Sequence, residues 1–74
     1  MTPLQIDIAD MQCWVFRLAQ KKWGLTPAEC SRVFSENGVL RFIADSYGIL
    51  HVSSYECALG DVERYLANRG VIVC

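Results

Sequence analysis

Hydrophobic residues recur every three or four positions along most of this chain, and this spacing is typical of helices with one buried face. The longest run predicts a helix over residues 3–22. Its hydrophobic stripe, at alternating steps of four and three, comprises Leu4, Ile8, Met11, Val15 and Leu18. Three shorter runs predict helices over residues 27–36, 39–46 and 54–68. We therefore expect a small all-α, four-helix domain.

Capping residues support the helix boundaries. Gly24 suits the left-handed conformation that ends a helix. The next residues, Thr26-Pro27-Ala28-Glu29, combine an N-cap, a proline at the first helical position and a glutamate that can bond back to the cap. Thr2-Pro3-Leu4-Gln5 repeats this chemistry at the start of the first helix. Ser53 is expected to cap the last helix in the same way, with Glu56 as its reciprocal partner.

Two short β-prone segments leave room for a minimal pair of strands. Residues 49–52 follow Gly48, which is expected to end the third helix, and residues 71–73 follow the last helix. If residues 71–73 are extended, they can pair with residues 49–52 or with the same tail of a second chain. Gly60, inside the last helix, is interpreted as a point of close helix packing.

Composition favours contact with another chain. Of the 74 residues, 53% are hydrophobic, which is more than is usual for soluble domains. A domain of this size has much surface for its volume, so part of the hydrophobic surface is expected to meet a protein partner or a second copy. The alternative is a tightly packed monomer. We expect residues 1–74 to form this single domain.

Charge and hydropathy disfavour several other classes of partner. Seven basic and eight acidic residues give a net charge of −1 without any basic cluster, so neither nucleic acid nor an anionic membrane is expected. No hydrophobic run approaches the length of a membrane span, and the first residues lack the basic leader of a signal peptide. A cytoplasmic location is expected.

The chemistry-bearing residues do not form a known catalytic or metal-binding pattern. The only histidine is His51, and the cysteines are not paired as C-x-x-C, so neither a metal nor a cofactor is expected. Cys13, Cys30 and Cys57 are interpreted as packing residues and Cys74 as exposed. His51 could act as a base for a cysteine or serine nucleophile. Because no catalytic signature surrounds it, a non-enzymatic protein is favoured.

Residues 26–47 also match the outline of a helix-turn-helix. The helix that would enter the major groove carries one basic residue, Arg41, and one acidic residue, Asp45. It therefore offers few of the phosphate contacts on which DNA affinity depends. A plain helical hairpin is favoured, with a nucleic-acid-binding regulator as the alternative.

Large amphipathic and charged side chains are the candidate partner contacts. Trp14 is the preferred one, since it lies at the edge of the first hydrophobic stripe between Asp10 and Arg17. Tryptophan and tyrosine anchor many interfaces, but they anchor small cores equally often. The candidate partner-binding residues are Trp14, Arg17, Trp23, Arg41 and His51.

Three short motifs are shared with a known family. They are Phe34 followed by Gly38-Val39, Tyr47 followed by Leu50-His51, and Asp61-Val62 followed by Tyr65-Leu66. Together with the 25–29 segment they resemble short bacterial proteins known as domain of unknown function 3791. The resemblance covers nearly the whole chain and implies no activity, cofactor or catalytic residue. Members of the family occur beside genes resembling ADP-ribosyltransferase-type toxins, which implies a role as antidote or accessory partner of such a neighbour.

Overall fold

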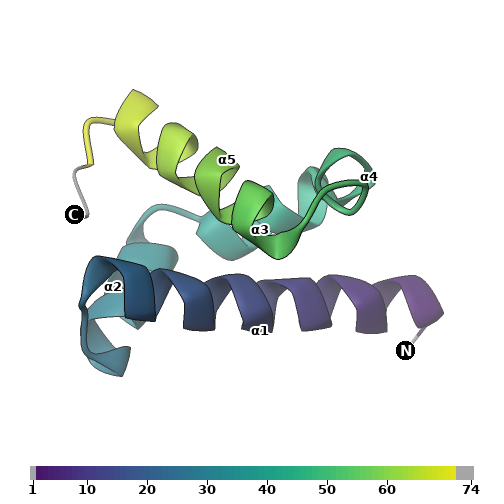
Figure 1. Ribbon diagram of the computed structural model, residues 1–74, viewed down its shortest axis with the longest axis horizontal. Helices are drawn as coiled ribbons and strands as arrows, with labels where there is room; N and C mark the ends of the chain where they lie inside the picture. Colours follow the sequence, from purple (N-terminus) through teal and green to yellow (C-terminus); the bar gives the residue numbers. More distant parts are fainter. Residues whose placement is uncertain (1, 72–74) are drawn as a thin grey trace.

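The computed structural model describes residues 2–71, which form five helices (Figure 1). They are α1 (Pro3–Trp23), α2 (Pro27–Glu36), α3 (Val39–Asp45), α4 (Tyr47–Leu50) and α5 (Tyr55–Asn68). The all-α prediction is confirmed, and each of the four predicted helices is present within one or two residues of its expected ends. The four-residue helix α4 is the element that the sequence pattern did not indicate.

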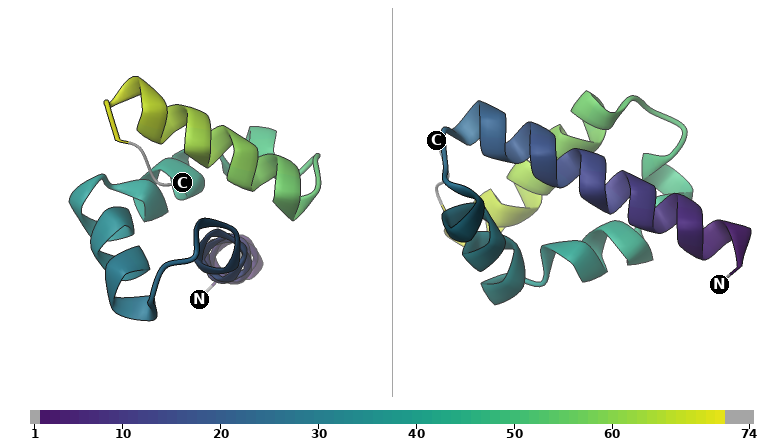
Figure 2. Two further views of the ribbon diagram at one scale, coloured as in Figure 1. Left: turned by 60° about the vertical axis from the view of Figure 1, so that its left-hand side comes forward. Right: turned by 90° about the horizontal axis from the view of Figure 1, so that it is seen from below.

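Helix α1 runs the full length of the molecule. A helix of 21 residues is about 31 Å long, and the longest dimension of the chain is 32 Å. Figure 1 shows α5 lying across α1, and the left view of Figure 2 shows α2 and α3 on another side of it. The short helix α4 lies toward the N-terminal end of α1, and α2 toward its C-terminal end (Figure 1). The helices α2, α3 and α5 therefore share α1 as a common support.

The core lies along the C-terminal two thirds of α1. From this helix it takes four residues at steps of four, namely Met11, Val15, Ala19 and Trp23. The other helices supply Cys30, Phe34, Val39, Ile43, Leu50, Ala58, Leu59, Val62 and Leu66. The predicted stripe is therefore right at Met11 and Val15, but Leu4 is 56% exposed and Leu18 is only half-buried. Leu4 is exposed because α1 is longer than the surface that the other helices cover.

A polar contact joins the two longest helices at the C-terminal end of α1. The indole nitrogen of Trp23 donates to Oε2 of Glu63 at 2.8 Å, and Nζ of Lys22 donates to Oε1 at 3.0 Å. Burial raises the pKa of the Glu63 carboxyl, but the two hydrogen bonds and the charge of Lys22 outweigh it and hold the pKa below its usual 4.5. Because Trp23 is only 7% exposed, its N–H needs this acceptor in place of water.

The caps of α1 and α2 are those that the sequence predicts. Thr2 and Thr26 each accept a hydrogen bond from the residue three positions later, whose side chain bonds back to the threonine amide. Gly24 has a φ of 66°, in the left-handed region that favours glycine. The cap of α5 is Ser54 rather than Ser53, with its hydroxyl accepting from the Cys57 amide. Cysteine at that position cannot complete a reciprocal box, so the bond is single.

The segment 49–52 is not a strand. It begins inside α4, where the Ser46 carbonyl accepts from the Leu50 amide and the Tyr47 carbonyl from the His51 amide, both at 2.9 Å. Gly48 therefore lies within α4, and Asp45 is the last residue of α3. Local helical bonds satisfy this backbone, whereas a strand would have needed a partner strand. Residues 2–71 contain no strand, and residues 72 and 73 of the second candidate lie outside the described residues.

Two interpretations of small residues are corrected. Gly60 is exposed, and a Cβ added there would meet nothing within 4 Å, so it does not mark close helix packing. Cys30 is buried as expected, and burial raises the pKa of its thiol. Cys13 and Cys57 are exposed because each lies on the side of its helix that faces away from the core. Cys74 lies outside the described residues.

The two threonine caps give a matched pair of variants. We expect Thr26→Ala to lower the free energy of unfolding by about 1 kcal/mol, since α2 begins at the corner against the core. Thr2→Ala should cost only a few tenths of a kcal/mol, because the first turns of α1 lie outside the core and can fray locally. Urea unfolding followed by circular dichroism measures both. Equal losses would contradict this division of α1.

The Glu63 contact predicts a specific dependence of stability on pH. A lowered pKa in the folded state stabilises the protein above the usual pKa of 4.5, and this contribution is lost as the pH falls through the folded value. Urea unfolding from pH 7 to about pH 3 should therefore show a shallower acid loss for Glu63→Gln than for the wild type. The exposed control Glu36→Gln should keep the wild-type slope. In all three proteins Glu29 retains its own acid-sensitive bond to the Thr26 amide. An unchanged slope in Glu63→Gln would refute this role.

Candidate functional site

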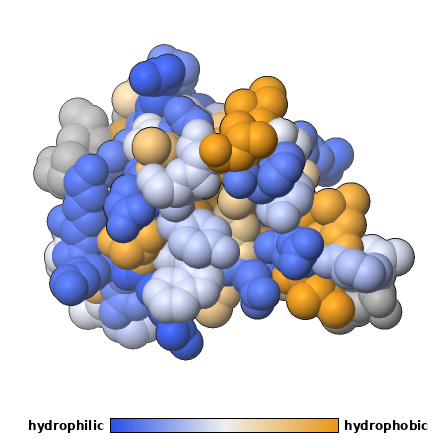
Figure 3. All heavy atoms as spheres, turned by 45° about the vertical axis from the view of Figure 1, so that its right-hand side comes forward, coloured by the Kyte–Doolittle hydropathy of each residue, from blue (hydrophilic) through white to orange (hydrophobic). Residues whose placement is uncertain are grey.

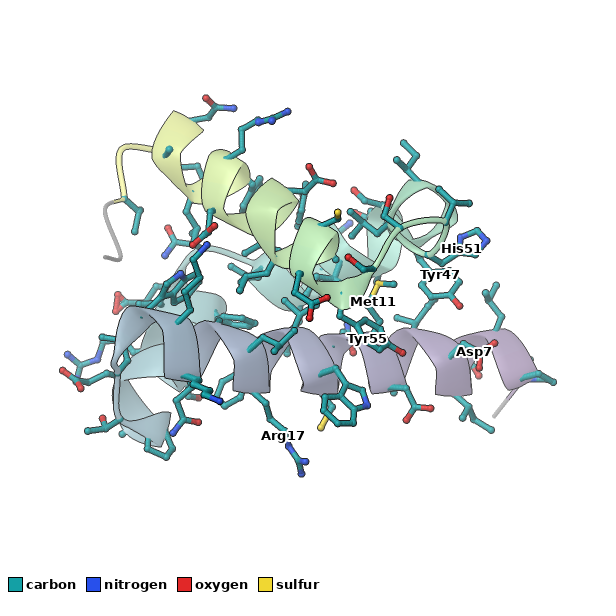
Figure 4. The ribbon with its side chains drawn as sticks, viewed as in Figure 1. Asp7, Met11, Arg17, Tyr47, His51 and Tyr55 are labelled. Carbon is teal, nitrogen blue, oxygen red and sulfur yellow. The ribbon has the colours of Figure 1, made fainter. Side chains whose placement is uncertain are left out.

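A groove of about 410 Å³ opens between the N-terminal half of α1, the helix α4 with its following turn, and the start of α5 (Figure 4). Its lining combines carboxylates, aromatic rings and hydroxyls. These residues are Asp7, Asp10, Met11, Tyr47, His51, Ser53, Ser54, Tyr55 and Glu56. We call it the α1–α4–α5 groove. The volume lies at the lower end of the range of small-molecule sites.

Helix α4 supplies two of the rings. Tyr47 and His51 are four residues apart and stack with their centroids 4.9 Å apart and 12° between their planes. Nδ1 of His51 lies 2.8 Å from the Tyr47 carbonyl oxygen. Because a carbonyl can only accept, Nδ1 carries the hydrogen and Nε2 is left available. Between them Leu50 is buried in the core, so a single helical turn anchors α4 and presents both rings to the groove.

The groove is electrostatically negative. Residues 2–71 contain two ion pairs, Lys22–Glu63 and Arg41–Asp45, and neither involves a groove residue. Of the described residues, no lysine or arginine lines the groove, whereas three carboxylates do. Burial raises the pKa of the Tyr47 hydroxyl, and the charge of Asp7 raises it further, with a smaller contribution from Tyr55. Tyr47 therefore stays a neutral hydrogen-bond donor beside a carboxylate (Figure 4).

A row of three side chains continues from the groove along α1. The Tyr55 ring lies nearly parallel to the Trp14 ring, with centroids 6.1 Å apart, and Cζ of Arg17 lies 5.8 Å from the centre of the Trp14 ring. Trp14 remains 49% exposed and Tyr55 39%. We call Tyr55, Trp14 and Arg17 the aromatic ledge. Since Tyr55 also lines the groove, the aromatic ledge and the groove form one continuous surface.

Further exposed hydrophobic side chains occur on the elements that carry this surface, although none of them lines the groove. Ile49 and Val52, on α4 and the turn after it, are each 75% exposed. At the projecting end of α1, Leu4 and Ile6 are also exposed. Figure 3 shows that the hydrophobic residues on this side of the molecule form separate patches among hydrophilic ones. This side of the molecule therefore has separate hydrophobic contact points and no single large hydrophobic face in the view of Figure 3.

The structure brings together three of the five residues proposed as partner contacts. Trp14 and Arg17 form the ledge, and His51 lies in the adjoining groove. Trp23 lies in the core instead, in the alternative role that tryptophan takes in small domains. Arg41 is exposed on α3 and lies 3.6 Å from Asp45.

The sequence reasoning missed most of the groove. The sequence pattern does not connect four of the groove residues, because they come from three separate elements. These residues are Asp7, Tyr47, Tyr55 and Glu56. One signal was available: the first basic residue of the chain is Arg17, so the start of α1 carries only acidic charge. The position of Tyr47 four residues before His51 also predicts that both lie on one side of a helical turn.

Other chemistry-bearing groups have structural contacts. The Ser54 hydroxyl caps α5, and Sγ of Cys30 lies 3.8 Å from the Phe16 carbonyl oxygen. Among residues 2–71, no three histidine, cysteine or acidic side chains are grouped so that they could hold a metal ion. No helix in the same range is both long enough and hydrophobic enough to cross a membrane.

The Tyr47 environment provides a direct test of the groove's charge. We expect Asp7→Asn to lower the pKa of the Tyr47 hydroxyl, since it removes the charge that adds to the effect of burial. The pKa should stay above the usual 10.0 because the burial remains. NMR titration of the tyrosine ring signals measures it, with Asp45→Asn on α3 as the control. No change in Asp7→Asn would show that Asp7 does not act on Tyr47.

Comparison with known proteins identifies the family. A family model described as a protein of unknown function, DUF3791, matches residues 10–69. No curated protein and no solved structure gives a significant match. The matched range contains the core, α4 and the start of α5, whereas Asp7 lies before it. Since the model covers well over half of the chain, the protein belongs to the DUF3791 family.

Proposed function

We propose that this chain is a non-enzymatic protein-interaction module, which binds a protein partner over the α1–α4–α5 groove and the aromatic ledge. The observation that carries the proposal is the stack of Trp14 on Tyr55, which leaves two large rings about half exposed beside a groove. Tryptophan, tyrosine and arginine are the side chains that contribute most to binding at interfaces. The ledge contains one of each.

The support beneath the ledge suits binding. Trp14 and Arg17 belong to α1, and Tyr55 to α5, so packed helices hold these side chains rather than a loop. Rings already stacked lose little conformational freedom when a partner covers them. Such preorganisation favours affinity from a small contact area.

Helix α4 and the carboxylates of the groove supply further parts of an interface. Ile49 and Val52 offer exposed hydrophobic contacts on α4 and the following turn, outside the groove lining, and the carboxylates offer polar contacts inside the groove. Interfaces commonly combine a hydrophobic centre with a polar border in this way. Two hydrophobic side chains at 75% exposure lose contact with water when a partner covers them, which stabilises the complex.

The family resemblance indicates which protein to test first as the partner. A toxin-like protein encoded beside this gene is the first candidate, and the chain would then act as its antidote or accessory subunit. A second copy of the chain is the other candidate. The proposal places this interaction in the cytoplasm, where free thiols such as Cys13 and Cys57 persist.

Co-expression with the product of the adjacent gene tests the proposal. We expect a stoichiometric complex by affinity capture and light scattering. The double variant Trp14→Ala/Tyr55→Ala should weaken it about thirtyfold, since truncating aromatic anchors costs roughly 2 kcal/mol of binding free energy.

A matched control is available on α3. Leu40 is exposed to a similar degree as Trp14, and its carbonyl accepts from Gln12 on a different side of α1 from the ledge. Leu40→Ala should bind as the wild type does. The proposal is wrong if the chain stays monomeric and uncomplexed, or if both variants have the same effect.

A further inference from the structure

Basic residues are absent from two segments of the sequence, and these two segments form the groove. Residues 2–16 and 42–63 contain no lysine or arginine, and every residue that lines the α1–α4–α5 groove comes from these two segments. Asp7, Asp10 and Glu56 are exposed there, and among residues 2–71 none of them forms an ion pair. Within residues 2–71, no ion pair therefore offsets the charge of the groove.

The aromatic ledge shows which cation its rings accept. The guanidinium of Arg17 already lies over one end of the Trp14–Tyr55 stack, at 5.8 Å from the centre of the Trp14 ring. The other ring of the stack, Tyr55, lines the groove together with the carboxylates of Asp7, Asp10 and Glu56. A guanidinium on Tyr55 would have a ring beneath it, as Arg17 has, together with carboxylates within the same groove.

We propose that the α1–α4–α5 groove binds an arginine side chain of the partner protein, stacked on Tyr55 and paired with one or two of the carboxylates of Asp7, Asp10 and Glu56. This inference rests on the proposed function and adds the chemistry of the contact. Carboxylates without an ion pair favour a cationic occupant over a hydrophobic one. The Tyr47 hydroxyl stays protonated beside Asp7, so it adds no further negative charge.

Arginine fits this groove better than lysine does. Its planar guanidinium stacks on aromatic rings and can bond two carboxylates at once. It is also less strongly hydrated than the lysine ammonium, so placing it against tyrosine rings costs less. The groove presents both features together, with rings from α4 and α5 and carboxylates from α1 and α5.

The test uses short blocked peptides as probes. A pentapeptide with two arginines is titrated into the labelled full chain, and amide NMR shifts are followed. Two matched peptides carry lysine or the neutral arginine analogue citrulline instead. We expect shifts centred on Tyr47, His51 and Tyr55, larger affinity for arginine than for lysine, and no binding of the citrulline peptide.

Two double variants with the same change in net charge locate the binding. Asp7→Asn/Asp10→Asn should weaken arginine-peptide binding about fivefold, because each exposed charge pair contributes modestly. Glu36→Gln/Asp45→Asn, on α2 and α3, should leave it unchanged. Equal effects of the two variants, binding of the citrulline peptide, or shifts outside the groove would overturn the inference.

The outcomes separate this inference from the proposed function. If the partner complex depends on Trp14 and Tyr55 but the peptide does not bind the groove, the inference is wrong and the proposed function stands. If no complex forms at all, the proposed function is wrong. A second copy as the source of the arginine would appear as self-association that Arg17→Ala abolishes, and it would overturn the assignment to a different protein.

Discussion

The packing of three helices against α1 is the constraint on which the rest of this structure depends. Met11, Val15, Ala19 and Trp23 form one row at steps of four, and such rows are the ridges by which helices pack. The small residues Val15 and Ala19 occupy the middle of the row, where neighbouring helices can approach closely. Trp23 closes the row at one end, and its bond to Glu63 fixes how α5 lies against α1. A chain of this size buries only a small core, so losing this row would lose the fold.

The same packing explains why a site can exist at the N-terminal end of α1. The core uses α1 only from Met11 onward, and the first turns of the helix project beyond it. Those turns form one wall of the α1–α4–α5 groove, with α4 and the start of α5 as the others. Leu50 anchors α4 through a single buried side chain, which leaves Tyr47 and His51 to face the groove. One helix thus supports the core from Met11 onward and contributes its first turns to the groove.

The local part of this fold could be predicted from the sequence. The caps at Thr2 and Thr26 need only residues within one turn, and the four longer helices follow from hydrophobic spacing. Burial was harder, because it depends on where the other helices end. Leu4 belongs to the same stripe as Val15, yet other helices cover only Val15 and leave Leu4 exposed. The segment after Ser46 was ambiguous for a similar reason, since four residues carry too little periodicity to distinguish a helical turn from a strand.

The candidate site could be predicted only in part. Trp14 and Trp23 both lie at edges of one helical stripe, but tertiary packing buries Trp23 and leaves Trp14 on the surface. Spacing within a helix cannot tell which edge a neighbouring helix will cover. The groove joins Asp7 to Tyr47 and Glu56, which are far apart in the chain, so no local pattern connects them. Trp14, Arg17 and His51 could be proposed one by one, but their shared surface depends on the fold.

The division of α1 into a core segment, from Met11 onward, and projecting first turns underlies both the fold and the candidate site. Native-state hydrogen exchange along α1 tests it most directly, because exchange reports the free energy of opening at each amide. We expect the amides of residues 15–23 to exchange only through global unfolding, and those of residues 6–10 to exchange much faster through local fraying. Uniform protection from one end of α1 to the other would contradict the account.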